Sequence, residues 1–250
     1  MAKITSIINQ KGGVGKTTTT CALAAGLARK GMKVLLVDFE PQTDSSFSFG
    51  IKKAKQNIDD VLEGRADISD VIVKTAEGID IIPGSYNLVS ADVKIKDINI
   101  LNKALNSVRD NYDFIIIDTP PMLGILTINA LVASDSIIIP AEAETFALRG
   151  IGNLYSTLVP IIDKYNPDLK IDGILPTKYR RVLLIHNSLR KSTEAIAERL
   201  NTRVFSPIRE GGKISEAQNK QKSIFDYAWR SNVAQDYWTF VNEYLEGDKE

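Results

Sequence analysis

A glycine-rich segment near the start of the chain limits the folds that this sequence can adopt more than any other feature. Residues 10–18 read QKGGVGKTT, between an apolar run at residues 3–9 and a stretch at residues 17–29 with Ala and Leu at helical spacing. Glycines between a buried strand and the start of a helix let backbone N–H groups wrap around phosphate oxygens, and the helix dipole strengthens that attraction. The segment therefore predicts a strand, a phosphate-binding loop and a helix, in that order.

The rest of the chain alternates short apolar runs with amphipathic stretches. Further strands are predicted at residues 33–38, 78–83, 113–118, 136–140, 170–175 and 203–205, and helices at residues 100–110, 145–165, 188–200 and 232–245. The strand runs are continuously apolar, which is typical of a parallel sheet covered by helices on both faces. Because we find no repeat, linker or low-complexity stretch, we expect residues 1–250 to form a single α/β domain with a doubly wound, mostly parallel sheet.

The composition excludes several classes of protein. One cysteine, Cys21, rules out a disulfide framework and a cysteine-ligated zinc or iron–sulfur site within one chain, and one histidine leaves little histidine-based metal chemistry. Residues 1–9 are followed by Gly and Lys rather than by a signal-peptide core, and no apolar run reaches the roughly 18 residues that cross a bilayer. We therefore expect a cytoplasmic protein, in a reducing compartment, with no membrane association.

The polar residues of the loop predict specific contacts with a nucleotide. Lys16 is placed to reach the β- and γ-phosphates, and the hydroxyl of Thr17 to bind Mg²⁺. The literal pattern GxxxxGK[ST] has Gln10 in place of its first glycine, followed by an additional lysine, Lys11. If two subunits face each other, Lys11 can reach the partner's nucleotide and act as an arginine finger does. The candidate nucleotide-binding residues of the loop are Lys11, Gly12, Gly13, Val14, Gly15, Lys16, Thr17 and Thr18.

Four motifs, in the same order, carry a resemblance to a known family. KGGVGKTT at residues 11–18 resembles the deviant Walker A motif of the ParA/MinD ATPase superfamily. VLLVDFEPQ at residues 34–42 is similar to its second nucleotide motif, DFIIIDTPPMLG at residues 113–124 to its Walker B and switch region, and IREGGKISEAQ at residues 208–218 to the C-terminal segment of ParA partition ATPases. The resemblance covers nearly the whole chain. It implies a short, Soj-like ParA protein that uses ATP and Mg²⁺ and has no N-terminal DNA-binding extension.

Three acidic residues are candidates for the metal site and for catalysis. Asp38 and Asp118 each end a buried strand, at the sheet edge where a carboxylate can hold Mg²⁺ through water or merely cap a turn. The resemblance implies an Asp that orients the attacking water where this chain has Glu40, whose carboxylate is one methylene further from the backbone. Glu40 is either a working variant or a change that slows hydrolysis. The candidate catalytic residues are Lys11, Lys16, Asp38 and Glu40, and the candidate metal ligands are Thr17, Asp38 and Asp118.

Two later loops are candidates for recognition of the base. By resemblance, residues 177–181 and 207–211 flank the adenine, although the family's residue types are only partly kept there. We expect Arg209, Gly211 and Gly212 to contact the base, largely through the backbone.

A local excess of positive charge suggests an anionic partner. The whole chain has 31 basic and 31 acidic residues, but residues 178–222 contain 11 Lys and Arg against 4 Asp and Glu. Such a segment is either a face for nucleic acid or an ordinary solvated surface, and contacts with phosphates give binding that is independent of sequence and sensitive to salt. Lys213 matches a DNA-contacting position of Soj-like proteins by resemblance. The candidate DNA-binding residues are Arg199, Arg203, Lys213, Lys220 and Lys222.

The resemblance implies a function in plasmid or chromosome partition. ATP brings two subunits face to face, the homodimer binds double-stranded DNA of the nucleoid without sequence preference, and a ParB-type centromere-binding partner stimulates hydrolysis. Transport of a protein cargo by the same mechanism is an alternative that the sequence leaves open. A MinD-type membrane-surface ATPase is disfavoured, because Asp236, Glu243 and Glu246 on the last predicted helix would repel anionic lipid.

Overall fold

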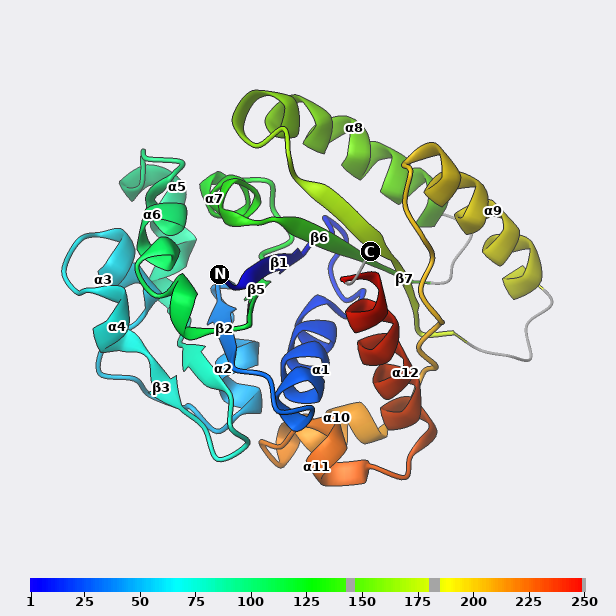
Figure 1. Ribbon diagram of the computed structural model, residues 1–250, viewed down its shortest axis with the longest axis horizontal. Coiled ribbons are helices and arrows are strands. Elements are labelled where there is room, and N and C mark those ends of the chain that lie inside the picture. The colour runs from blue at the N-terminus through cyan, green and yellow to red at the C-terminus, as the bar shows by residue number, and fades with distance from the viewer. Residues whose placement is uncertain (143–146, 180–184, 249–250) are drawn as a thin grey trace.

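The fold is built on one twisted, mostly parallel sheet (Figure 1). The structure, a computed structural model, describes residues 1–142, 147–179 and 185–248. In these ranges seven strands are ordered β3-β4-β2-β5-β1-β6-β7, and every pairing is parallel except that of β3 with β4. The strands are β1 (Lys3–Ile7), β2 (Val34–Asp38), β3 (Val73–Lys74), β4 (Asp80–Ile82), β5 (Phe114–Asp118), β6 (Ser136–Glu142) and β7 (Lys170–Thr177).

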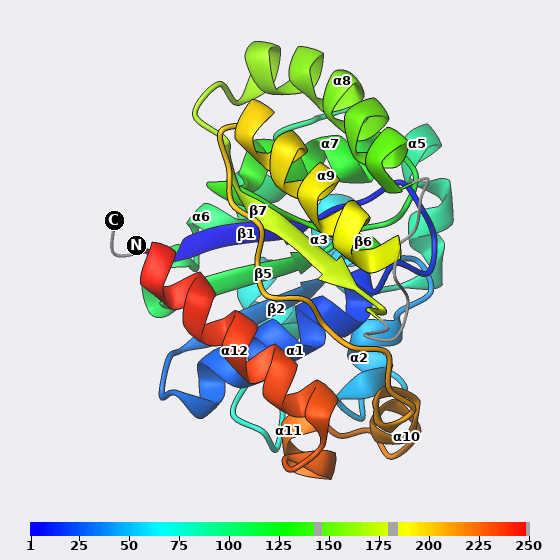
Figure 2. The same ribbon diagram turned by 90° about the vertical axis from the view of Figure 1, so that its right-hand side faces the viewer.

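Helices cover both faces of the sheet (Figures 1 and 2). The helices are α1 (Lys16–Arg29), α2 (Asp44–Ser48), α3 (Ile58–Leu62), α4 (Ile68–Val71), α5 (Ala91–Lys94), α6 (Ile100–Asn106), α7 (Ile125–Ala133), α8 (Ala147–Tyr165), α9 (Ile185–Arg199), α10 (Lys213–Asn219), α11 (Ile224–Ala228) and α12 (Asn232–Gly247), with 3₁₀ turns η1 (Tyr86–Ser90) and η2 (Arg109–Asn111). Helices α1 and α12 pack on one face, and α6, α7 and α8 pack on the other.

The apolar runs of the sequence become strands that are buried on both faces. Along β2, Leu36 packs into the layer that contains α1 and α12, whereas Leu35 and Val37 pack into the layer that contains α6 and α7. Side chains of a strand alternate between faces, so a strand covered on both sides needs an apolar residue at every position. This explains the continuous apolar pattern and confirms the predicted α/β class with a doubly wound, mostly parallel sheet.

Helix α12 lies directly across α1 because Gly26 lets the two backbones approach closely (Figure 2). A Cβ atom at Gly26 would lie 2.5 Å from Cγ2 of Val241 and 3.2 Å from the ring of Phe225. Contacts below about 3 Å would force the helices apart, since packed interiors leave little free space. The C-terminal helix therefore holds α1 in place, and with it the loop that precedes α1.

The structure also departs from the expectations in several places. The strand predicted at residues 203–205 is wrong, because only Val204 bridges to Ile174. The pairing stops there because the next two hydrogen bonds of a parallel ladder would need an N–H group on Pro176 and on Pro207, and proline has none. The antiparallel edge strand β3, helix α7 and the short helices were not predicted. Residues 145 and 146 of the predicted helix at 145–165 lie outside the described ranges, and the assignment of residues 1–250 to a single domain stays a prediction.

One feature of the helices bears on the expected lack of membrane association. Among the helices in the described ranges, none is both long enough and apolar enough to cross a lipid bilayer.

Candidate active site

The carboxyl ends of three neighbouring strands bring the predicted loop and the two aspartates together. In the sheet register Asp118 of β5 lies beside Ile7 of β1 on one side and beside Asp38 of β2 on the other. Parallel strands end at the same edge, so the loop that follows β1 must pass over both carboxylates.

The loop between β1 and α1 depends on glycine at two positions. Gly13 has a φ of +75° and Gly15 a φ of +93°, a backbone region that favours glycine. Asn9 ties the start of the loop down, because its Nδ2 donates to the carbonyl of Pro140 over 2.7 Å and its Oδ1 accepts from the N–H of Lys11 over 2.9 Å. The loop is therefore anchored to the end of β6 as well as to its own helix.

Hydroxyl groups surround the two buried aspartates. Asp118 accepts hydrogen bonds from the hydroxyls of Ser45 (2.6 Å) and Thr20 (3.3 Å), and also from that of Thr17. Asp38 accepts from both the N–H (2.8 Å) and the hydroxyl (2.6 Å) of Ser46. The two serines lie in the first turn of helix α2, which follows directly after the segment that contains Glu40. Helix α2 thus fixes both carboxylates in place.

The site holds more negative than positive charge in a buried setting. Burial, reinforced by the charge of Asp118, raises the pKa of Asp38 to about 7 and that of Glu40 to about 7. Burial also raises the pKa of Asp118. Burial lowers the pKa of Lys16, although the negative charges of Asp118 and Glu40 oppose this shift. Such a cluster favours the arrival of a cation, which would offset the mutual repulsion of the carboxylates.

The oxygen donors of the site suit Mg²⁺ that arrives together with phosphate. In the described ranges, no group of three or more His, Cys, Asp and Glu residues is arranged to hold a metal by itself. Mg²⁺ commonly binds one or two protein oxygens and completes its octahedron with water and phosphate oxygens. The hydroxyl of Thr17, which bonds to Asp118 at the start of α1, fits that role, and so does the Asp118 carboxylate.

Lys11 is engaged within its own chain by a residue that the sequence did not single out. Its Nζ lies 2.9 Å from Oε2 of Glu142, and the Nζ of Lys178 lies 3.3 Å from the other carboxylate oxygen. Glu142 is the last residue of β6. Although burial opposes the shift, the hydrogen bonds from Lys11 and Lys178 lower the pKa of Glu142. Glu142 is therefore an ionised anchor between two lysines.

A cavity of about 330 Å³ opens beside the phosphate loop, where the sequence places the base. Gly13 and Gly15 line it on one side, and residues 177–178 and 208–212 line it on the other. The guanidinium of Arg209 donates to both carboxylate oxygens of Asp236, over 2.8 and 2.6 Å, so this side chain ties the loop to α12. The structure thus brings the two predicted loops together. Residues 180–181 of the first loop lie outside the described ranges.

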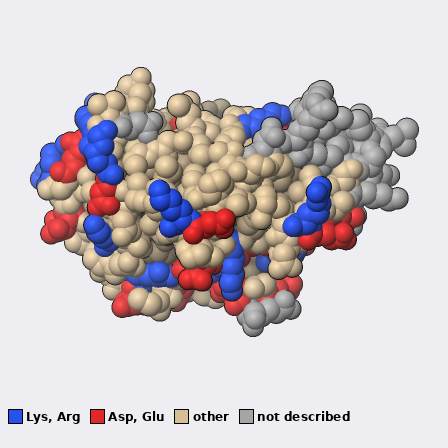
Figure 3. Space-filling model, turned by 90° about the horizontal axis from the view of Figure 1, so that it is seen from above, with Lys and Arg blue, Asp and Glu red and all other residues tan. Residues whose placement is uncertain are grey.

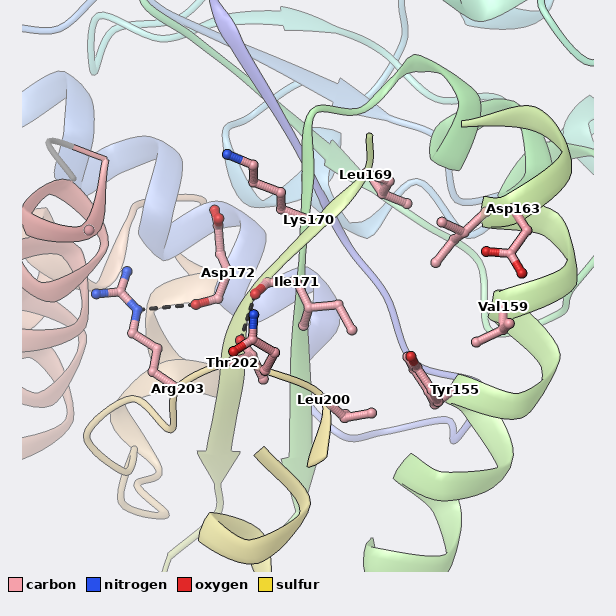
Figure 4. Close-up of a pocket in the computed structure, with 13 residues that line it drawn as sticks. Tyr155, Val159, Asp163, Leu169, Lys170, Ile171, Asp172, Leu200, Thr202 and Arg203 are labelled. Atoms are coloured by element: carbon pink, nitrogen blue, oxygen red, sulfur yellow. Dashed lines mark hydrogen bonds between the residues drawn. The ribbon is translucent and has the colours of Figure 1, made fainter. Parts of the chain in front are cut away.

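The five candidate DNA-binding residues do not form one surface. Arg203 packs over the ring of Phe205 at 4.5 Å and donates to the carbonyl of Asp172 at 3.1 Å (Figure 4). A Cβ atom at Gly247 would lie 2.5 Å from Cζ of Arg203, so the guanidinium lies against the end of α12. Arg199 ends α9, whereas Lys213, Lys220 and Lys222 lie at or just after α10, where Lys213 pairs with Glu216 at 2.7 Å.

Arg203 lies far from the phosphate loop, and one face of the molecule shows no patch of positive charge alone (Figure 3). The cavity that Arg203 lines, about 580 Å³ in volume, also includes Lys170, Ile171 and Asp172 at the amino-terminal end of β7, opposite the edge that carries the phosphate loop (Figure 4). On the face drawn in Figure 3, most of the described surface is uncharged, and the basic side chains lie next to acidic ones. Three of the five candidates, Lys213, Lys220 and Lys222, lie at or just after α10, so the DNA prediction now depends on this segment.

Sequence reasoning missed the residues that hold the acidic groups. Gly84 follows β4, and a Cβ atom there would lie 2.9 Å from Cγ of Asp38, so only glycine fits. Its N–H donates to the hydroxyl of Ser46 at 3.1 Å. The pair Ser45–Ser46, directly downstream of Glu40, was a usable signal, since hydroxyls near a predicted metal site often orient its ligands. Glu142, a carboxylate two residues after the strand predicted at residues 136–140, was another.

A doubly wound sheet with a glycine loop after its first strand, and with aspartates at the ends of two strands beside it, defines a P-loop nucleotide-binding protein. A sequence profile described as an AAA domain matches residues 2–171. The Bacillus subtilis sporulation initiation inhibitor protein Soj is 40% identical over 253 residues, covering 97% of this chain and 98% of that protein. The chromosome partitioning protein ParA of Caulobacter vibrioides is 33% identical over 258 residues, covering 99% and 96%.

The chain is also similar in fold and in sequence to a solved structure. Cobyrinic acid a,c-diamide synthase from Mycobacterium smegmatis, crystallised with bound ADP and magnesium, superposes with a TM-score of 0.86 at 32% identity, covering 100% of this chain and 96% of that one. The chain belongs to the ParA/MinD family of P-loop ATPases, and the resemblance carried by its four motifs is confirmed.

Proposed function

We propose that this chain is a partition ATPase that binds ATP with Mg²⁺, forms a homodimer around the nucleotide and binds double-stranded DNA without sequence preference. The observation that carries the proposal is the buried set of Lys16, Asp38 and Asp118 beneath the glycine loop. The partition role is supported by the name of the Caulobacter relative, a chromosome partitioning protein. The choice of nucleotide and metal is supported by the ADP and magnesium of the Mycobacterium enzyme.

Each residue of the site has a role in this proposal. Lys16 binds the β- and γ-phosphates, Thr17 and Asp118 would hold Mg²⁺, and Asp38 would support the metal by supplying a second carboxylate at the same sheet edge. Mg²⁺ supplies charge neutralisation for the phosphates and for the carboxylates. Glu40 is half-buried beside Asp118 and orients the water that attacks the γ-phosphate. Phosphoryl transfer needs positioning and electrostatic stabilisation of this kind more than covalent help from the protein.

The length of the side chain at position 40 is open to a direct test. Glu40→Asp shortens the side chain by one methylene and restores the residue type that the resemblance implies. We expect the rate of phosphate release with ATP to stay within about twofold of the parent or to rise, because the carboxylate that orients the water is retained. Glu40→Gln, which removes the charge, is the control and should lose most of its activity. A loss of tenfold or more in Glu40→Asp would show that the site is built around glutamate.

The ion pair of Lys11 with Glu142 suggests how a cross-subunit lysine is restrained before dimerisation. Glu142→Gln weakens this pair, and we expect the concentration for half-maximal ATP-dependent dimerisation to fall about two- to fivefold, the value of one partly exposed ion pair. Light scattering after gel filtration, with ATP and with ADP, measures the effect. The exposed Asp110→Asn is the matched control.

Lys11→Ala should impair dimerisation and hydrolysis much more than it impairs ATP binding. If both Lys11→Ala and Glu142→Gln dimerise like the parent, Lys11 has no role across the interface.

The DNA-binding part of the proposal is tested by fluorescence anisotropy of a random-sequence duplex. We expect binding with ATP and Mg²⁺ but not with ADP, and a steep loss of affinity as salt increases. Lys220→Ala/Lys222→Ala should weaken binding uniformly for all sequences, whereas the exposed Lys103→Ala should not. Absence of binding in both nucleotide states would remove the DNA role.

Two further parts complete the proposal. A ParB-type partner stimulates hydrolysis, and the ATPase associates with the nucleoid.

A further inference from the structure

Helix α10 forms a further wall of the cavity beside the phosphate loop, which we call the base cavity. Ile214, Ser215 and Gln218 line this cavity together, since residues three and four positions apart in a helix lie on the same side. Ala217, on another side of the helix, is 2% exposed and packs in the layer that contains α1 and α12. The packing of Ala217 therefore fixes the rotation of α10 that brings Gln218 to the cavity.

The base cavity can hold a flat purine ring, but its shape does not select one purine over another. Its volume of about 330 Å³ lies within the range of small-molecule sites, about 300–1,000 Å³. Val14, Ile208 and Ile214 line it with apolar surface, which packs against the face of any base. Adenine and guanine differ in the polar groups along their edges. A polar group of the cavity must therefore make the choice between them.

Two cations of the base cavity are held by carboxylates that do not line it. The backbone N–H of Arg209 donates to Asp236 over 3.0 Å, and its guanidinium donates to the same carboxylate over 2.8 and 2.6 Å. Lys178 pairs with Glu142 at 3.3 Å. A base could use these groups only by breaking bonds to ionised partners, which are stronger than bonds between neutral groups. Neither cation is therefore suited to reading the edge of a base.

Two hydroxyl groups of the cavity are engaged as well, whereas the amide of Gln218 is free. The hydroxyl of Thr177 donates to the carbonyl of Val14 at 2.8 Å, and the hydroxyl of Tyr237 lies 3.4 Å from that of Thr19. In the part of the chain that the structure describes, the side-chain amide of Gln218 has no hydrogen-bond partner. Because Gln218 is half-buried, its amide loses less hydration than an exposed amide would when a ligand binds.

We propose that Gln218 selects the base of the nucleotide, with its amide oxygen accepting from the N6 amino group of adenine and its amide nitrogen donating to N7. The inference rests on the proposed function, since it concerns the nucleotide of that same site. A glutamine amide carries an acceptor and a donor side by side, which matches the N6/N7 edge of adenine. Guanine presents two acceptors, O6 and N7, on the same edge. The amide oxygen of Gln218 would then face O6 with no proton between the two oxygens.

The test measures the affinity of the full chain for three diphosphates with Mg²⁺ by isothermal titration calorimetry. The diphosphates are ADP, GDP and 7-deaza-ADP, which has a C–H group in place of N7, and none of them is hydrolysed during the titration. We expect the parent to bind ADP at least about tenfold more tightly than GDP and about fivefold more tightly than 7-deaza-ADP. In Gln218→Leu, which keeps most of the side-chain volume and removes the amide, both ratios should fall below about twofold.

Three further variants serve as controls. Gln218→Ala, which has a high helix propensity, should behave like Gln218→Leu and guards against a packing defect of the larger side chain. Gln218→Glu keeps an acceptor for N6 but offers no donor to N7, so it should bind ADP and 7-deaza-ADP within about twofold of each other. Asn219→Ala removes an exposed amide from the same helix that does not line the cavity, and it should keep the ratios of the parent.

The outcomes separate this inference from the proposed function. Equal binding of ADP and 7-deaza-ADP by the parent would overturn the contact with N7. A preference for ADP over GDP that survives in both Gln218→Leu and Gln218→Ala would overturn the role of Gln218 in selection. Either result leaves phosphate binding through Lys16, and with it the proposed function, intact. Failure of the parent to bind any of the three diphosphates would overturn the proposed function and this inference together.

Discussion

Replacement of Lys16 by alanine is expected to lower the affinity for ATP at least about 100-fold, because two charge-assisted contacts with the β- and γ-phosphates are lost. Lys16 is 8% exposed, and no other lysine is buried to this extent in the described ranges, so no neighbouring cation replaces it. Isothermal titration calorimetry with a non-hydrolysable ATP analogue and Mg²⁺ measures the loss. The variant must keep the far-ultraviolet circular dichroism of the parent.

The control for Lys16→Ala is Lys103→Ala, which removes an exposed lysine from α6. This variant should bind the analogue like the parent. If Lys16→Ala also retained the affinity of the parent, the glycine loop would not be the phosphate site, and the proposed function would fall with it.

Replacement of Asp38 by asparagine is expected to stabilise the nucleotide-free protein while impairing hydrolysis. Asp38 is fully buried, and its pKa is raised from 3.8 to about 7 by burial and by the charge of Asp118. A difference of about three pKa units corresponds to roughly 4 kcal/mol as an upper limit at pH 8, so we expect a gain of about 2–4 kcal/mol. We expect phosphate release to fall at least about tenfold, as for other groups that orient metal ligands.

The raised pKa of Asp38 predicts how the stability of the folded protein changes with pH. A carboxylate whose pKa is higher in the folded than in the unfolded chain holds its proton more tightly when folded, so the protein loses stability as the pH rises from about 4 to about 7. Urea unfolding without nucleotide at pH 5 and pH 8 should show this loss in the parent and a smaller loss in Asp38→Asn. The exposed Asp110→Asn should follow the parent. Equal stability of Asp38→Asn and the parent at pH 8 would refute this account of the charge cluster.

Much of the site followed from the sequence because its chemistry is local. Gly13, Gly15 and Lys16 lie within one strand–loop–helix unit, and the loop needs glycine wherever its φ is positive. Asp38 and Asp118 are 80 residues apart in the chain, yet each was placed correctly at the sheet edge because each ends a continuously apolar strand. In a parallel sheet, residues that end strands meet at one edge whatever the order of the strands.

The order of the strands and the packing of side chains were decided by the tertiary structure. Glu142 reaches Lys11 because β6 lies next to β1, and Gly84 reaches Asp38 because β4 lies next to β2. Arg203 and Arg209 were assigned by charge and by resemblance, but Phe205, the end of α12 and Asp236 determine where their guanidinium groups lie. The sequence by itself determined the phosphate loop, the two aspartates and the sheet class, since these depend on local spacing and burial. Contacts between distant segments depend on which strands are neighbours, and only the folded chain settles that.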